Sequence, residues 1–256
     1  MALQNTLPDP NFKRRFDGED HTSGTTGPGF ASVKLTNDQK VLSTRTNSQR
    51  LISRAIAGQK WKVDINYNPM TQAEFNPVYA FLLDKQGPLN SFFVSLPQYR
   101  TVENSAWQTL VTELDGSGDL KNISKTNAAF SAGVSEIIFD CALANGTAVA
   151  IGADSKYPMP GELITFTDSS DATHTKAYII TTVETNAAHQ SGTTNPTNNT
   201  IRINISPPLV KNVADNSVIN FADQAKVKVV MTQPFSSYNL NTNNLYQFNL
   251  KLEEYL

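Results

Sequence analysis

The sequence predicts a mainly β protein with one α-helix. Many short segments alternate apolar and polar residues with period two, and turn-forming residues separate them. Only one stretch repeats its apolar residues at helical spacing. One helix among ten or more short strands favours a sandwich or barrel architecture. The 256 residues suffice for a buried core and for one or two domains.

Residues 1–30 have little apolar periodicity and are expected to form a flexible N-terminal arm or loop. The stretch 17–29 is rich in Gly, Ser, Thr and Asp, which favour turns. Three basic residues at 13–15 are followed at once by acidic ones, so we expect a solvated segment rather than a binding patch. Ordering of this arm on a neighbouring subunit and plain disorder both remain open.

Strands are expected directly after this arm. Segments 32–35 and 40–43 flank a predicted turn at Asn37-Asp38. The clearest strand is 60–67, where every second side chain is apolar, which indicates one buried face.

One helix is predicted over about 72–85. Thr71 and Glu74 have the spacing of a capping box, and the apolar residues that follow recur with a period of 3.6. Pro77 leaves a second start open, with Asn76 as the cap and Pro77 at the first helical position. A Gly-Pro pair ends the helix.

The second half of the chain predicts another β unit. Residues 99–124 are polar and are expected to be a connector. Further strands are expected at 134–140, 161–167, 176–183, 200–205 and 225–231. The regular final segment 245–256 must bury its apolar face, so it is expected to return to the first β unit. The resulting layout is a discontinuous domain of residues 31–98 plus 233–256, into which residues 125–232 are inserted as a small β-barrel or β-sandwich.

Composition argues against several classes of function. The formal net charge is −2, the pI is about 5.9 and basic residues are scattered, so we expect no sequence-specific nucleic-acid binding. The N-terminus lacks the features of a signal peptide, and no apolar run reaches the roughly 18 residues of a membrane helix. Membrane insertion is therefore not expected. The low charged fraction of 17% leaves a neutral polar surface, which is compatible with extensive subunit contacts.

No arrangement of residues predicts catalysis, a cofactor or a metal site. The histidines are expected on the surface, in polar loops or at a strand edge: His21, His174 and His189. Asp168 and Asp171 bracket a turn and are interpreted as turn formers before calcium ligands. Cys141 lies in an apolar run and is expected to pack in the core. The protein is therefore predicted not to be an enzyme.

Trp107 is the one aromatic residue singled out for an interface or a ligand. It lies in the polar connector, whereas Trp61 belongs to the apolar face of a strand. Packing of Trp107 beneath its own loop is the alternative.

Three blocks of sequence resemble bacteriophage distal tail or baseplate-type minor tail proteins. Residues 59–83, with Phe92–Pro97, are similar to that family's aromatic strand, helix and proline-closed strand. Residues 160–166 are similar to its Gly-Asp hairpin, and residues 203–209 to its Pro-Pro-Leu turn. The N-terminal loop and the long connector depart from the pattern.

The resemblance implies a non-enzymatic virion protein that assembles in the host bacterial cytoplasm. It implies a homo-oligomer, usually a hexameric ring, in which a β-sandwich or split-barrel domain joins the tail tube to the tip, hub or baseplate. The inserted domain would project outward to hold neighbouring tail proteins. A carbohydrate-binding adhesin module, which requires an exposed Trp107, and a tail tube or terminator protein are the alternatives, with a hydrolase a distant third.

Overall fold

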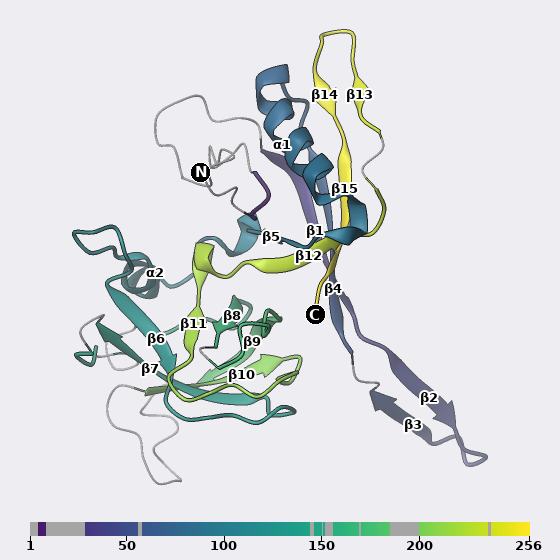
Figure 1. Ribbon diagram of the computed structural model, residues 1–256. Coiled ribbons are helices and arrows are strands. Elements are labelled where there is room, and N and C mark those ends of the chain that lie inside the picture. Colours follow the sequence, from purple (N-terminus) through teal and green to yellow (C-terminus); the bar gives the residue numbers. More distant parts are fainter. Residues whose placement is uncertain are drawn as a thin grey trace. The chain divides into compact units, whose positions relative to one another are not determined.

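The computed structural model confirms a mainly β protein and divides the chain into two compact units (Figure 1). Unit 1 comprises Met1–Val94 with Lys228–Tyr255, and unit 2 comprises Ser95–Val227 with Leu256. The structure describes residues 5–8, 29–55, 58–143, 146–149, 151, 156–168, 170–184, 200–234 and 237–256. Most of the expected N-terminal arm, and the expected exposed loop at 186–199, lie outside these residues.

A five-stranded sheet forms the centre of unit 1, with strand order β1-β4-β15-β12-β5. Its strands are β1 (Phe30–Asp38), β4 (Lys60–Tyr67), β15 (Asn249–Glu254), β12 (Val227–Met231) and β5 (Phe92–Val94). The C-terminal strand β15 pairs antiparallel with β4 and with β12, which confirms that the end of the chain returns to the first β unit. The alternation seen in the sequence of β4 is real, since its apolar side chains are buried and its polar ones are not.

Helix α1 (Gln72–Lys85) packs its apolar face on this sheet. The Thr71 N–H donates to the Glu74 carboxylate at 2.9 Å, which satisfies one free donor of the first turn and confirms the capping box. Pro77 lies inside the helix, so the start at Pro77 is wrong. Phe75 and Phe81 contact Phe248 and Phe92 with ring centroids 5.6 and 5.4 Å apart, and these aromatic contacts fix the helix on the sheet.

The predicted turn at Asn37-Asp38 is wrong. Both residues belong to β1, where they pair with Trp61 and Lys60 of β4. The chain continues into β2 (Val41–Arg45), which pairs with β3 (Leu51–Ala55), and the reversal occurs only between them. Strands β1 and β4 thus lead into a second, separate two-stranded sheet that extends away from the five-stranded one (Figure 1).

A second hairpin of unit 1 lies along α1 (Figure 1). It is formed by β13 (Asn239–Leu240) and β14 (Tyr246–Gln247). Tyr246 stacks on Phe75 with ring centroids 4.5 Å apart, and Tyr238 contacts both rings. The hairpin is therefore held to the helix by an aromatic cluster.

Unit 2 is a closed six-stranded barrel with strand order β10-β7-β6-β11-β8-β9. Its strands are β6 (Asn122–Thr126), β7 (Glu136–Leu143), β8 (Leu163–Thr167), β9 (Ala177–Glu184), β10 (Thr200–Ser206) and β11 (Val218–Asn220). Closure pairs the backbone edges that an open sheet would expose. The interior is filled by side chains such as Ile137, Phe139, Ile164, Tyr178 and Ile203.

A second helix, α2 (Ser105–Thr112), lies where the sequence predicted a connector, so the expectation of a single helix was incomplete. Asn104 caps it by accepting from the backbone N–H groups of Ala106 and Trp107. Trp107, Leu110 and Val111 recur at i, i+3 and i+4 and are buried. In the described residues, three short 3-10 helices complete the elements: Gly87–Leu89, Pro97–Tyr99 and Ala222–Gln224.

Candidate functional site

The most exposed regular element of unit 1 is the β2–β3 hairpin. Its strands pair in strict antiparallel register from Val41↔Ala55 to Arg45↔Leu51. Every described side chain of the two strands is exposed. A two-stranded hairpin is only marginally stable in water by itself. An exposed hairpin of this kind is therefore expected to pack against another surface.

Large apolar side chains lie on both faces of this hairpin. Val41, Leu42, Leu51 and Ile52 are 53, 64, 58 and 51% exposed. Because opposite residues share a face, Leu42 and Ile52 lie diagonally on one face, and Val41 and Leu51 lie on the other. Apolar surface is therefore available to a partner from either side.

The hairpin is also strongly basic. Residues 39–55 contain Lys40, Arg45, Arg50 and Arg54 and no acidic residue. Within the described part of the chain, none of the three arginines takes part in an ion pair. This patch is not visible in the sequence, because the four cations are spaced four or five residues apart. Pairing of the strands brings them onto one element.

The tip of the hairpin is a tight turn. The Gln49 N–H donates to Thr46 O at 2.9 Å and the Thr46 N–H donates to Arg50 O at 3.0 Å. The Thr46 hydroxyl lies 2.8 Å from that of Ser48, and Gln49 adopts a left-handed conformation with φ of 65°. These bonds give the exposed strands a defined end.

The two edges of the five-stranded sheet differ. Residues beside β5 cover its outer edge, because Leu7 N–H donates to Phe93 O at 2.8 Å and Phe93 N–H donates to Asn5 O at 2.7 Å. Strand β1, at the other edge, pairs with β4 on one side, and no described residue pairs with its outer side. An unpaired edge of nine residues is a template for a strand from another chain.

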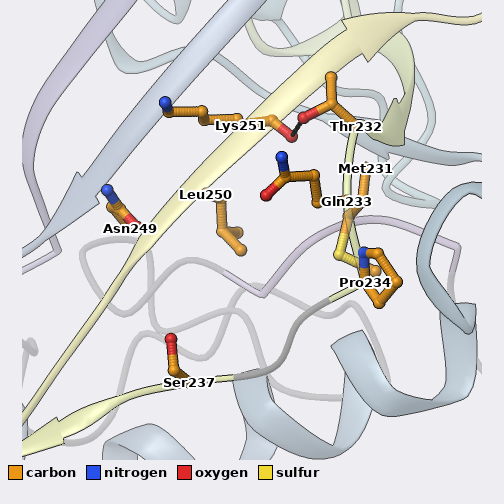
Figure 2. Close-up of a pocket in the computed structure, with 8 residues that line it drawn as sticks. All are labelled: Met231, Thr232, Gln233, Pro234, Ser237, Asn249, Leu250 and Lys251. Atoms are coloured by element: carbon orange, nitrogen blue, oxygen red, sulfur yellow. Dashed lines mark hydrogen bonds between the residues drawn. The ribbon is translucent and has the colours of Figure 1, made fainter.

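Unit 1 also contains a pocket of about 220 Å³ beside strands β12 and β15 (Figure 2). Thr232 donates its hydroxyl to Lys251 O at 3.1 Å along one wall. The described lining consists of Met231, Thr232, Gln233, Pro234, Ser237, Asn249, Leu250 and Lys251. Lys251, Thr232 and Ser237 could in principle act as an acid, a base or a nucleophile, but the described lining places no carboxylate, imidazole or thiol beside them to activate them.

Trp107 lies inside unit 2, not on its surface. Its side chain is 0% exposed, and its ring centroid is 5.1 Å from that of Phe221 and 6.0 Å from that of Phe139. Helix α2 thereby places the indole in the core of the barrel. The ring is not accessible to a ligand in this structure.

The expectation of a surface position is wrong for His174. It is 2% exposed, its Nε2 lies 2.8 Å from the Tyr178 hydroxyl, and burial lowers the pKa of its imidazole. His21 and His189 lie outside the described residues. The closed barrel, rather than the local sequence, buries His174.

The other singled-out residues behave as expected. Asp168 accepts from the Ser170 N–H at 2.8 Å and Asp171 from the Thr173 N–H at 2.8 Å, which confirms their role in turns. Cys141 is buried in the barrel core, and burial raises the pKa of its thiol to about 11. A thiol with such a pKa is a poor nucleophile at neutral pH.

Among the described residues, His, Cys, Asp and Glu side chains nowhere gather in a group of three that could hold a metal ion. The helices found in the described part of the chain are too short or too polar to span a bilayer. Among the described residues, the exposed basic hairpin and the unpaired edge of β1 are the surfaces of unit 1 that a partner could cover.

Comparison with known proteins identifies the same region. Residues 18–99 match the family described as distal tail protein pb9, A domain, N-terminal. The matched segment, about a third of the chain, contains β1 to β5, α1 and the basic hairpin. No curated protein matches the chain.

Proposed function

We propose, from the membership of residues 18–99 in a phage distal tail family, that the chain forms a ring at the distal end of a phage tail. The match confirms the resemblance seen in the sequence and supports a structural role in a phage tail as part of the virion. In more detail, we propose a homo-oligomeric ring of about six subunits that joins the tail tube to the tip or hub complex. We also propose that the protein has no catalytic activity.

The observation that carries this proposal is the β2–β3 hairpin within the matched segment. Its four half-exposed apolar side chains each contribute about 1 kcal/mol when covered, since full burial of such a side chain is worth about 1.5–3 kcal/mol. Burial of one hairpin thus contributes about 4 kcal/mol to binding. This is close to the lower limit of the loss of translational and rotational freedom on association, which costs about 4–15 kcal/mol. A single contact is therefore weak, and a closed ring, in which every subunit makes two, is favoured over a dimer.

Charge supports a second copy of the chain as the partner of the hairpin. The hairpin holds four of the 21 basic residues, which leaves 17 against all 23 acidic residues, a formal charge of −6. A hairpin with four cations is attracted to such a surface and steers association. The open edge of β1 provides a further place for pairing between subunits.

We propose that unit 2 is the inserted domain that holds neighbouring tail proteins. Its support is the division of the chain, since residues 95–227 form one compact unit between the two parts of unit 1. Because the barrel is closed, its strand edges are already paired. Contacts of unit 2 would therefore use its loops and side chains rather than strand addition.

The alternative of a carbohydrate-binding adhesin is less well supported. It required Trp107 in an exposed groove, and the indole is fully buried. A tail tube or terminator protein would share the ring, but was expected to have a smaller insertion than the barrel of unit 2.

The test is the mass of the purified protein in solution, measured by light scattering at several concentrations. We expect a ring of about six subunits, or a monomer that closes into one when tail proteins are added. A monomer that stays a monomer under both conditions, and is absent from the virion tail, would refute the proposal.

A matched pair of variants tests the hairpin. Leu42→Ser with Ile52→Ser removes about 2 kcal/mol per contact, which should weaken each contact on the order of 30-fold. Leu83→Ser with Leu89→Ser alters two other large apolar side chains of unit 1 that are at least half exposed, and should leave assembly unchanged. If both variants assemble like the wild type, another surface holds the ring.

A further inference from the structure

Unit 2 contains a pocket of about 250 Å³ that the proposed assembly does not use. It lies between the segment that follows the 3-10 helix Pro97–Tyr99 and the turn that enters β8. Its lining residues are Gln98, Tyr99, Thr101, Val102, Glu103, Pro160, Gly161, Glu162 and Leu163. The two charged residues among them are both carboxylates, so the pocket has a negative character.

Glu162 is the unusual member of this lining. Its side chain is 8% exposed, and its Oε1 accepts from the Glu103 N–H at 3.3 Å. Its Oε2 is buried and has no hydrogen-bond partner among the described residues. A buried carboxylate oxygen without a partner costs the full desolvation of that atom. Such an atom in a native structure needs an explanation, and a bound hydrogen-bond donor is one.

We propose that this pocket binds an organic cation, a primary ammonium or a guanidinium group, which donates to the carboxylate of Glu162. A charge-assisted hydrogen bond to a carboxylate is among the strongest that proteins make. The pocket is several times larger than the roughly 30 Å³ that one water occupies, and is smaller than most drug-sized sites. It therefore suits a group of the size of one lysine or arginine side chain.

Other occupants fit less well. An inorganic anion would be repelled by the two carboxylates of Glu103 and Glu162. A divalent metal ion would need more protein ligands than the two carboxylates, and the described residues provide no group of three. The same cationic chemistry is offered by a free amine and by a basic side chain of a neighbouring protein, and the experiment distinguishes these sources.

The titration of Glu162 gives the binding a characteristic signature. Burial is the largest cause and outweighs the backbone hydrogen bonds of Met159 and Glu103, which lower the pKa of Glu162. Together with the nearby Glu103 carboxylate, burial raises this pKa to about 7, so about half of the protein carries a proton there at neutral pH. Tyr99, which also lines the pocket, has a pKa raised by burial and stays neutral. A cation favours the carboxylate, so binding at pH 7 releases up to about half a proton per site.

The experiment is an NMR titration of the full chain with butylamine and, separately, with Nα-acetyl-lysine amide. We expect both to shift signals of the pocket, and Glu162→Gln to weaken binding at least tenfold. Glu113→Gln, which alters an exposed carboxylate paired with Lys121 elsewhere in unit 2, should leave it unchanged. A tenfold preference for one probe would identify the source of the natural ligand.

Two outcomes would overturn the inference. One is equal binding of butan-1-ol, which has the same length and no charge. The other is binding of the amine without proton release in a pH-stat measurement at pH 7. This measurement needs only the wild-type protein, so it remains possible if Glu162→Gln fails to fold. The inference does not depend on ring formation, because the pocket lies wholly within unit 2.

Discussion

Replacement of Glu162 by glutamine should change the way in which the stability of unit 2 depends on pH. The group binds its proton more tightly in the folded barrel than in the unfolded chain, because burial raises its pKa from 4.5 to about 7. The folded state is therefore stabilised by protonation, and the free energy of unfolding should fall as the pH rises from about 4.5 to 7. Above pH 7 this contribution is constant.

The size of the effect follows from the two pKa values. Their difference corresponds to about 3 kcal/mol, which the wild type loses across this pH window and Glu162→Gln does not. His174 acts in the opposite direction in the same range, because its pKa is lowered by burial and the unfolded chain takes up the proton first as the pH falls. The difference between wild type and variant at each pH cancels His174 and isolates Glu162.

The assay is urea unfolding between pH 4.5 and 8 in a Trp61→Phe background, without added amine. Trp107 is then the sole tryptophan of the chain, and its fluorescence reports on the barrel. We expect the variant to gain about 3 kcal/mol relative to the wild type between pH 4.5 and 8. A difference that stays constant across this range within about 0.5 kcal/mol would refute the argument that Glu162 is buried as an unpaired acid.

Two further predictions concern local features. Gly87→Ala should destabilise unit 1 by about 1–3 kcal/mol in chemical unfolding, because Gly87 has a φ of 70° and an added Cβ would lie 3.1 Å from Pro234 Cα. In the control Gly116→Ala the added Cβ meets nothing within 4 Å, so the cost should be no more than about 0.5 kcal/mol. Equal costs for the two variants would contradict this account. Cys141 should react with Ellman's reagent at least about 100-fold more slowly in the folded than in the urea-unfolded chain, because a pKa of about 11 leaves little thiolate. Rapid stoichiometric labelling of the native protein would contradict this prediction and show that the thiol is accessible.

The parts of the fold that the sequence predicted are those with strong local periodicity. Strand β4 alternates over eight residues, and its buried face is the one expected. Helix α1 begins at Gln72, where the Glu74 carboxylate accepts from the Thr71 N–H, and it continues through Pro77, which has no N–H to donate. In both cases the same local pattern determines the element and its buried face.

Helix α2 was missed although it carries a readable signal. Asn104 is a favourable cap, and Trp107, Leu110 and Val111 have helical spacing. The segment is only eight residues long and lies among polar residues, so its composition suggested a connector. Its stability comes from burial of Trp107 in the barrel rather than from local propensity.

Features of the candidate sites could not be read from the sequence because they depend on pairing between distant segments. The cations of the hairpin look scattered until strand pairing places Arg54 opposite Leu42. Glu162 follows a Pro-Gly turn and looks like an ordinary exposed acid, and it becomes buried because the segment around Glu103 covers it. His174 is likewise enclosed by Phe166 and Tyr178.

The arrangement of charges on the hairpin is consistent with the proposed assembly. On each face an arginine lies directly opposite an apolar side chain, Arg54 opposite Leu42 and Arg45 opposite Leu51. Charges beside apolar strand residues oppose indiscriminate pairing, since two such hairpins repel one another. An acidic surface removes that repulsion and covers the apolar groups at the same time. In the proposed ring, this arrangement would therefore disfavour pairing of two hairpins and favour contact with a negatively charged neighbour.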